Sequence, residues 1–540
     1  MRPGALAADV ACFAALAIAC VWQLHDLERV LDLARWDEAD YLRGGVSLLA
    51  RGLPDAEWGP LHTVWYFAVS RLQPDRVALY YLSYRLLIVL PTLAIYVAGR
   101  RVGGSPIVSV ALALLFAGSM APHVVPRATL LAVLVVLVAI AAAARAASFA
   151  SFALAAAISL CVASFARPEL FVAFAIVSAA FAASLLRKPA RSAEGRRRSL
   201  FLAVGWAASV AVLVAVFGNP FGNRSNRRFY AFCQHFAVAE VRRAQLDIDP
   251  WGQCDVVLHR VFGSATSLGD AARANPAAFF THLRENASAY PGASLALYES
   301  GFGGAPRERR QGWMCLFLVA ALAAAAVRMR RSWRRAVRAP ETGRTALVAL
   351  AVLVPTIASA ILIHPRDHYL VMQGVLVPLV FVALTGRAAR GSSDGPAPAG
   401  RPALAIAAAA SIAAASPALA PLQANRSQPL LDRVRALRVV DGGSIADPVG
   451  ILELEGGIDA YLGTGFQRVL PDERRPEESF FEFLRRRHVA VVALGPALER
   501  HRLFSGDEQF QAFARDPERF GGHRLAVPSL VFTSAGSLPP

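Results

Sequence analysis

The chain is a long succession of apolar segments separated by short polar stretches that are rich in arginine. A helix needs about 20 apolar residues to cross the hydrocarbon core of a bilayer. By that measure we expect about eleven membrane-spanning helices. Their centres lie near Ala15, Leu87, Leu114, Val136, Ala157, Phe174, Val210, Ala321, Val354, Val377 and Ala410. The expected fold class is therefore an α-helical polytopic membrane protein.

The basic residues fit an orientation signal better than a nucleic-acid interface. The formal net charge is +17, although only 18% of the residues are charged and 55% are hydrophobic. With a cytoplasmic N-terminus, every basic cluster falls on the cytoplasmic side, as the positive-inside rule requires. These clusters are Arg100-Arg101, Arg145 and the runs 187–198, 328–338 and 387–401. We expect a multi-pass protein of the inner (plasma) membrane and no nucleic-acid partner.

The same alternation places two long loops, 25–76 and 218–311, and the tail outside the cytoplasm. We divide the chain into a transmembrane domain, 1–421, and an extracytoplasmic domain, 422–540. The tail alternates a helical pattern at 478–487, a buried strand at 489–494, a helix at 508–515 and a strand at 529–533. That order is typical of a small α/β domain. A cleaved signal peptide over residues 1–20 is the alternative, but its removal would break the alternation.

Two adjacent carboxylates, Asp37 and Glu38, follow the first apolar segment. Each would cost about 2.5 to 3.5 kcal/mol at the bilayer centre, so a pair at a helix exit indicates a role at the membrane surface. The apolar spacing after Asp37 predicts a short amphipathic surface helix that stops at Gly52. Asp37 fits an active-site acid and, equally well, an N-cap residue completed by Asp40.

The outer segments carry a pattern that resembles the GT-C membrane glycosyltransferases. The pattern begins with the acidic pair and its surface helix and continues at Gly59-Pro60-Leu61, Trp65-Tyr66, Val125-Pro126-Arg127, Arg167-Pro168-Glu169, 364–370 and Pro378. The branch it most resembles contains the dolichyl-phosphate-mannose protein mannosyltransferases, the lipid A aminoarabinose transferases and related bacterial enzymes of the cell envelope. The resemblance implies a GT-C-like fold and a polyprenyl-phosphate sugar as donor.

The resemblance also implies roles for individual residues. Asp37 would be the catalytic base, while Glu38 would position the acceptor or be the base itself. Arg366, Arg127 and Arg167 would bind the donor phosphate, because a guanidinium matches phosphate oxygens in a bidentate way. Snorkelling toward the interface is the alternative for Arg127 and Arg167.

Possible accessory residues are His62, His364, His368 and Tyr369. The chain departs from the family pattern at Gly59, at His62 and at Asp367-His368, which separate Arg366 from Tyr369. These departures point to an acceptor side unlike that of the well-studied members. A divalent metal between His364 and His368 is conceivable, but Pro365 argues against one helix through both, so no metal and no certain cofactor are assigned.

Cys233 and Cys254 share the large outer loop, where a disulfide is permitted; a bridge and two free thiols both fit the sequence. The expected function is a hexosyl- or pentosyltransferase that moves a sugar from a polyprenyl-phosphate donor to an extracytoplasmic glycolipid, glycan or protein. The alternatives are a membrane transporter or flippase and a polysaccharide polymerase or ligase that acts on lipid-linked glycans.

Overall fold

The computed structural model describes residues 3–119, 121–187, 193–220, 222, 226–298, 340–390, 428–440, 442–443, 447–527 and 529–533. The chain forms two compact units. The first contains Met1–His25, Pro54–His62 and Arg85–Leu422, and the second contains Asp26–Leu53, Thr63–Tyr84 and Gln423–Pro540. Two stretches of the first outer loop therefore belong to the same compact unit as the tail.

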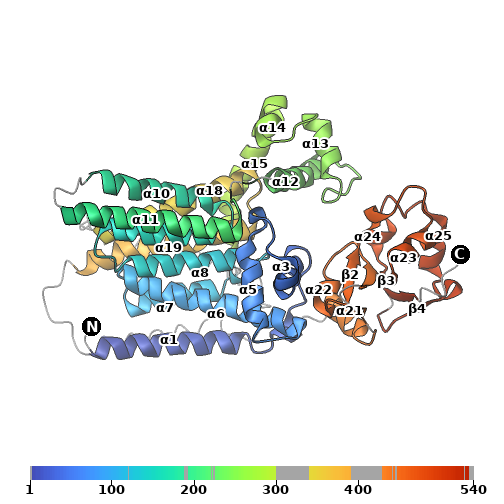
Figure 1. Ribbon diagram of the computed structural model, residues 1–540, viewed down its shortest axis with the longest axis horizontal. Coiled ribbons are helices and arrows are strands. Elements are labelled where there is room, and N and C mark those ends of the chain that lie inside the picture. The colour runs from blue at the N-terminus through green and yellow to red at the C-terminus, as the bar shows by residue number, and fades with distance from the viewer. Residues whose placement is uncertain are drawn as a thin grey trace. The chain divides into compact units, whose positions relative to one another are not determined.

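The first unit is a bundle of apolar helices that run side by side (Figure 1). They are α1 (Pro3–Gln23), α6 (Arg76–Val102), α7 (Pro106–Ala117), α8 (Ala128–Ala143), α9 (Phe149–Ser164), α10 (Leu170–Arg187), α11 (Ala193–Phe217), α18 (Pro340–Leu362) and α19 (Asp367–Arg390). The first part of α6, residues 76–84, belongs to the second unit. Helix α9 buries Ala153, Ala156 and Ala157. Small side chains of this kind let helices in a membrane approach closely.

Several of these helices are long and apolar enough to cross a bilayer. Within the described residues five segments meet that criterion: Leu6–Val30, Arg76–Val102, Ala193–Phe217, Thr342–Leu362 and Asp367–Leu384. Helices α7 to α10 are apolar but shorter. The chain is therefore an integral membrane protein. The predicted spans near Ala321 and Ala410 lie outside the described residues, whereas every other predicted centre falls within a helix of the bundle.

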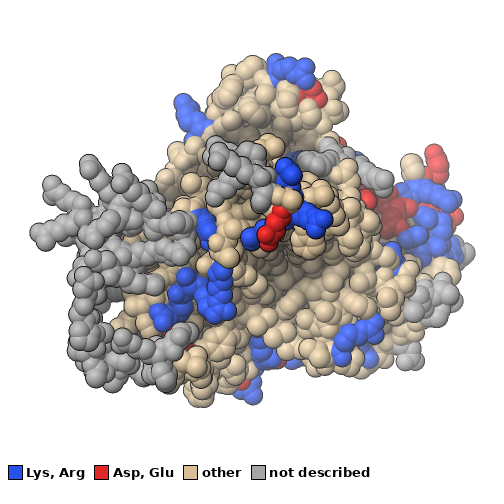
Figure 2. Space-filling model, turned by 60° about the vertical axis from the view of Figure 1, so that its left-hand side comes forward, with Lys and Arg blue, Asp and Glu red and all other residues tan. Residues whose placement is uncertain are grey.

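The distribution of charged side chains on the surface fits a mostly apolar chain. Figure 2 shows Lys and Arg side chains in separate small groups on a face that consists mostly of uncharged residues. The orientation of the two termini across the membrane stays a prediction.

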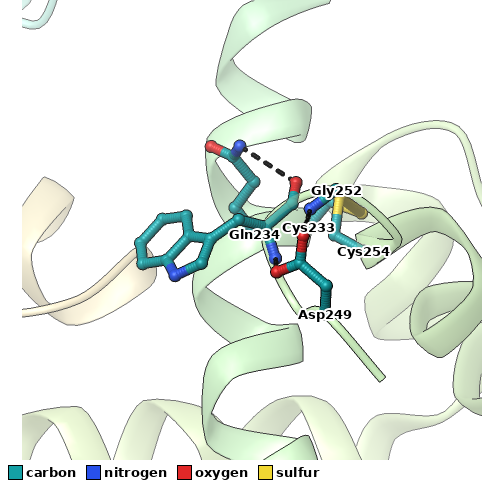
Figure 3. Close-up of a disulfide and its surroundings, with 6 residues drawn as sticks. Cys233, Gln234, Asp249, Gly252 and Cys254 are labelled. Atoms are coloured by element: carbon teal, nitrogen blue, oxygen red, sulfur yellow. Dashed lines mark hydrogen bonds between the residues drawn. A yellow bond between two sulfur atoms is a disulfide. The ribbon is translucent and has the colours of Figure 1, made fainter. Parts of the chain in front are cut away.

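A small helical lobe of the first unit lies between α11 and α18 in the sequence. It consists of α12 (Arg227–Ala244), α13 (Cys254–Phe262), α14 (Leu268–Ala274) and α15 (Pro276–Ala296). Its core contains Phe232, Phe236, Phe262 and Phe279. The residue pattern of the loop 218–311 predicts two helices, near 229–243 and 276–290. The helices α12 and α15 confirm both. Cys233 and Cys254 form a disulfide, with Cα atoms 5.5 Å apart, between α12 and the start of α13 (Figure 3).

The second unit joins part of the first outer loop to the tail. The loop contributes α2 (Leu27–Val30), α3 (Asp37–Val46) and α4 (Leu48–Arg51), while η1 (Ala56–Trp58) belongs to the first unit. Helix α5 (Pro60–Ser70) begins in the first unit and continues in the second. The helix predicted after Asp37 is present as the two segments α3 and α4, and it ends at Gly52, whose φ of 74° suits a residue without a side chain. Its place at the membrane surface stays a prediction.

The tail is a small sheet covered by helices, as expected for an α/β domain. Its five strands are arranged in the order β2-β1-β3-β5-β4, with β1 parallel to β2 and β3 and with β5 antiparallel to β3 and β4. The strands are β1 (Val449–Leu452), β2 (Phe466–Val469), β3 (Val489–Ala493), β4 (Gly522–Arg524) and β5 (Leu530–Thr533). The tail helices are α21 (Pro429–Leu437), α22 (Ile458–Leu462), η4 (Pro471–Glu473), α23 (Phe480–Arg486), α24 (Pro496–Glu499), α25 (Glu508–Arg515) and η5 (Glu518–Phe520).

The tail core explains why the predicted elements form. The buried aromatic side chains Phe480, Phe483, Phe510 and Phe513 come from α23 and α25 and pack with Val489 and Val492 of β3. Ser479 and Glu482 form a capping box at the start of α23. The four elements predicted in the tail correspond to α23, β3, α25 and β5.

Candidate functional site

The acidic pair opens α3 in the second unit. The N-cap of α3 is Trp36, with φ of 55° and without a side-chain cap hydrogen bond, and Asp37 is the first helical residue. The interpretation of Asp37 as the N-cap is therefore wrong. A positive φ at a residue other than glycine costs on the order of 1–3 kcal/mol, and such residues concentrate at functional sites. The half-buried Asp37 side chain directly follows this strained position.

Glu38 is held more tightly than Asp37. Its side chain is completely buried, and the buried hydroxyl of Tyr66 in α5 donates a hydrogen bond of 2.5 Å to Glu38 Oε1. The helices α3 and α5 meet closely at Gly45, where an added Cβ would lie 2.4 Å from Tyr66 Cβ. Gly45 thus permits the approach that brings Tyr66 to Glu38. The assignment of the base to Asp37 or Glu38 stays a prediction.

In the first unit, Arg167 lies in the turn between α9 and α10. Its Nη2 is 2.6 Å from Glu169 Oε1, and both side chains are mostly buried. The Arg167 guanidinium carbon lies 4.9 Å from the ring centroid of Tyr369, the third residue of α19. Because the Arg167 side chain is mostly buried, this contact gains from cation–π attraction.

Arg366 lies in the connection between α18 and α19, close to the small helical lobe. Its guanidinium carbon is 5.5 Å from the ring centroid of Trp251. The connection is fixed by α15, since Asn286 Nδ2 donates to the carbonyl of Ile361 at 2.9 Å and His282 Nε2 lies 3.1 Å from the carbonyl of Ile363. The lobe therefore sets the position of Arg366.

Arg227, the first residue of α12, is a third arginine near the start of α19. Its guanidinium carbon lies 4.0 Å from the ring centroid of Trp58, and its Nη1 donates to the carbonyl of Glu57 at 3.1 Å. The sequence did not single out this arginine. Only its contacts in the folded chain distinguish it from the neighbouring Arg228.

Arg167, Arg227 and Arg366 converge on the start of α19, and we call these three residues the arginine cluster. Each of them lies near enough to interact electrostatically with the side chains of both His368 and Tyr369. Planar guanidinium groups at one helix end, surrounded by aromatic rings, offer several donors to an anion. Two of the predicted phosphate-binding residues, Arg167 and Arg366, thus belong to one cluster.

The remaining predicted residues of the first unit lie near helix ends. Arg127 is completely buried at the start of α8 and lies close to His123. His62 is also completely buried, in the first turn of α5. The backbone N–H of Leu61 donates to the carbonyl of Phe165 at 2.9 Å, which joins the start of α5 to the turn that carries Arg167.

His364 and His368 have separate surroundings. His364 precedes α19 and stacks on His235 of α12 with a centroid distance of 5.4 Å, whereas the buried His368 contacts Tyr369. Burial, and then the charges of Arg366 and His364, lower the pKa of His235 to about 3, so His235 is neutral at neutral pH. Among the described residues, no group of three or more His, Cys, Asp or Glu side chains is arranged to hold a metal ion.

Asp37 and Glu38 belong to the second unit, and Arg127, Arg167 and Arg366 belong to the first. Their convergence on one cavity stays a prediction.

No protein-family model matches this chain, and no curated protein matches it. Among solved structures, the chain is similar to the archaeal oligosaccharyltransferase AglB from Archaeoglobus fulgidus, in complex with an inhibitory peptide and a dolichol-phosphate. The TM-score is 0.42 and the sequence identity is 13%, and the similarity covers 98% of this chain and 75% of that chain. A TM-score at this level carries no argument about the activity of this chain.

Proposed function

We propose that this protein is a membrane glycosyltransferase that moves a hexose or pentose from a polyprenyl-phosphate donor to an extracytoplasmic acceptor. The observation that carries the proposal is the arginine cluster at the start of α19. Three guanidinium groups at one helix end of a membrane domain, one of them paired with Glu169, suit a ligand whose anionic head lies at the bilayer surface and whose tail remains in lipid. A polyprenyl phosphate has this form.

The chemistry needs a base for the acceptor and cations for the leaving group. The acceptor hydroxyl gives its proton to the carboxylate of Asp37, and its oxygen forms a bond with the anomeric carbon of the sugar. The bond between that carbon and the phosphate oxygen breaks, and the electron pair stays on the polyprenyl phosphate. The arginine cluster stabilises the additional negative charge on the phosphate.

The acidic pair supports this assignment through its local structure. Glu38 is buried and held by Tyr66, while Asp37 is half-buried and follows the strained residue Trp36. We therefore assign the base to Asp37 and a supporting role to Glu38. Arg127, His62 and Tyr369 are proposed to line the donor side.

The proposal is tested with radiolabelled polyprenyl-phosphate hexoses and pentoses, purified protein and an envelope fraction as acceptor source. We expect the wild type to transfer the label and Asp37→Asn to reduce the rate about 10²- to 10⁴-fold, because a positioned general base contributes this much. The matched control is Asp26→Asn in the same loop, whose carboxylate pairs with Arg29 at an exposed site. It should transfer at the wild-type rate.

The other outcomes assign the protein to the alternatives. Movement of an intact lipid-linked sugar across a vesicle membrane, without bond exchange, would identify a transporter or flippase. A change in glycan chain length would identify a polymerase or ligase. Transfer that continues unchanged in Asp37→Asn would remove Asp37 from the mechanism.

A further inference from the structure

One segment of the tail, residues 453–468, packs around the start of α3 within the second unit. The hydroxyl of Tyr461 donates to the carbonyl of Ala34 at 2.6 Å. Arg35 forms an ion pair with Glu455, and Arg76 Nη1 donates to the carbonyl of Ala460 at 2.9 Å. The tail thus contacts the chain immediately before and along the helix that begins with the acidic pair.

A second ion pair joins Arg43 of α3 to Asp459 of α22. Arg43 Nη2 lies 2.7 Å from Asp459 Oδ1, and the Asp459 side chain is only 3% exposed. Arg43 Nη1 also pairs with Asp40, at 2.9 Å. Removal of one partner of a buried pair leaves an uncompensated charge, so the contact strongly specifies how α3 is held.

Two further contacts reach the acidic pair more closely. The guanidinium carbon of Arg468 lies 5.4 Å from the ring centroid of Trp36, the residue with positive φ that precedes Asp37. Gly457 has φ of 121°, and a Cβ there would lie 3.3 Å from Ala39 Cβ. The tail therefore contacts both the strained residue Trp36 and the first turn of α3.

We propose that the tail is part of the catalytic unit, and that Arg43, Asp459 and Arg468 are positioning residues that hold Asp37 in its reactive place. This inference rests on the proposed function, because it assumes that Asp37 is the base. The tail contributes no reacting group; it fixes the helix that carries one.

The test compares Asp459→Asn and Arg43→Gln with the wild type in the transfer assay, using the labelled donor that the wild type consumes. We expect kcat to fall about 10- to 100-fold, because a small displacement of a catalytic group is enough for such a loss. The KM for the donor should stay unchanged, since the arginine cluster that binds the phosphate is untouched. The kcat is expressed per mole of folded protein, so a purely structural defect would lower the yield of folded protein and leave this kcat unchanged.

The double variant Arg43→Gln with Asp459→Asn tests whether the two residues act through one contact. We expect it to lose no more kcat than either single variant, because residues that share one interaction are not additive. Arg43→Lys keeps the charge and should retain more kcat than Arg43→Gln. The matched control is Asp472→Asn, which removes an exposed ion pair with Arg502 in the same domain and should leave kcat unchanged.

Two results would overturn the inference: a wild-type kcat in Asp459→Asn, or additive losses in the double variant. Either result, in a protein whose Asp37→Asn variant is inactive, would contradict positioning by the tail while leaving the proposed function intact. An active Asp37→Asn variant would contradict the proposed function first.

Discussion

At the scale of single residues, the buried carboxylates Glu38 and Glu453 show how acids are held in the second unit. Tyr66 donates to Glu38, and the backbone N–H groups of Gly457 and Ile458 each donate to Glu453 Oε1 at 3.1 Å. Burial, and then the Asp459 carboxylate, raise the pKa of Glu453 to about 7 from the usual 4.5. Through these two hydrogen bonds Glu453 holds the turn at Gly457, which contacts Ala39 of α3.

The raised pKa of Glu453 predicts how the stability of the tail depends on pH. Between about pH 4.5 and pH 7 the folded tail keeps the proton on Glu453, while the unfolded chain has released it. The folded state then binds more protons, so its free energy of unfolding decreases as pH rises through this window. Cleavage of the tail by a protease at increasing urea concentration gives an unfolding midpoint. We expect this midpoint to be higher at pH 5 than at pH 8.

The control is Glu453→Gln, which keeps the acceptor oxygen but does not titrate. It should reduce the difference between the midpoints at pH 5 and pH 8. An unchanged difference in this variant would show that another group causes the pH dependence.

Sequence reasoning found the acidic pair because two charges beside an apolar segment are conspicuous. It did not find the positive φ of Trp36, which depends on contacts that form only in the folded chain. It also missed Arg227, because Arg227-Arg228 resembles any other basic pair in an outer loop. Only the contact with Trp58 and the nearby start of α19 distinguish Arg227 from its neighbour.

At the scale of elements, the disulfide encloses the turn that presents Trp251 to Arg366. Figure 3 shows Asp249 and Gln234 beside the bridge between Cys233 and Cys254. The Asp249 carboxylate accepts from the backbone N–H groups of Trp251 and Gly252 at 3.0 and 3.1 Å. The bridge and these hydrogen bonds fix the turn that carries Trp251, and Trp251 contacts Arg366 of the arginine cluster.

Removal of the bridge should destabilise the lobe. Cys233 and Cys254 are 21 residues apart in the sequence, and a bridge across a loop of this length stabilises a fold by about 3 kcal/mol. We expect Cys233→Ser with Cys254→Ser to lower the urea midpoint at which α12 to α15 become cleavable. The substitution Cys161→Ser, at a free buried cysteine in α9, serves as the comparison. Equal midpoints for the bridged and unbridged lobes would contradict this expectation.

The elements with a strong periodic pattern were predicted, and the weak ones were not. The apolar spans and α12, α15, α23 and α25 have repeated apolar positions over two or more turns. The strands β1, β2 and β4 were missed. β1 contains Gly450, which is uncommon in strands, β2 has the polar residues Gln467 and Arg468 at its centre, and β4 has only three residues. Their pairing with β3 is a tertiary interaction that no local pattern specifies.

At the scale of the whole molecule, the division of the chain is the finding that the sequence could not supply. The tail was expected as a domain on its own, whereas residues 26–53 and 63–84 form one compact unit with it. The contact between Arg43 and Asp459 joins positions 416 residues apart. No pattern of composition or spacing relates residues at such a separation, so the supporting role of the tail became apparent only from the contacts.

The central claim is that the arginine cluster binds the phosphate of a lipid-linked sugar. The most direct test is the dissociation constant of the purified full chain for undecaprenyl phosphate, for the wild type, Arg227→Gln and Arg228→Gln. Arg228 is the matched control, because its Nη2 points to the carbonyl of Pro220. We predict about 10- to 100-fold weaker binding for Arg227→Gln alone, the loss expected for a charge-assisted hydrogen bond. Equal affinity of the wild type for undecaprenyl phosphate and for undecaprenol would contradict the claim.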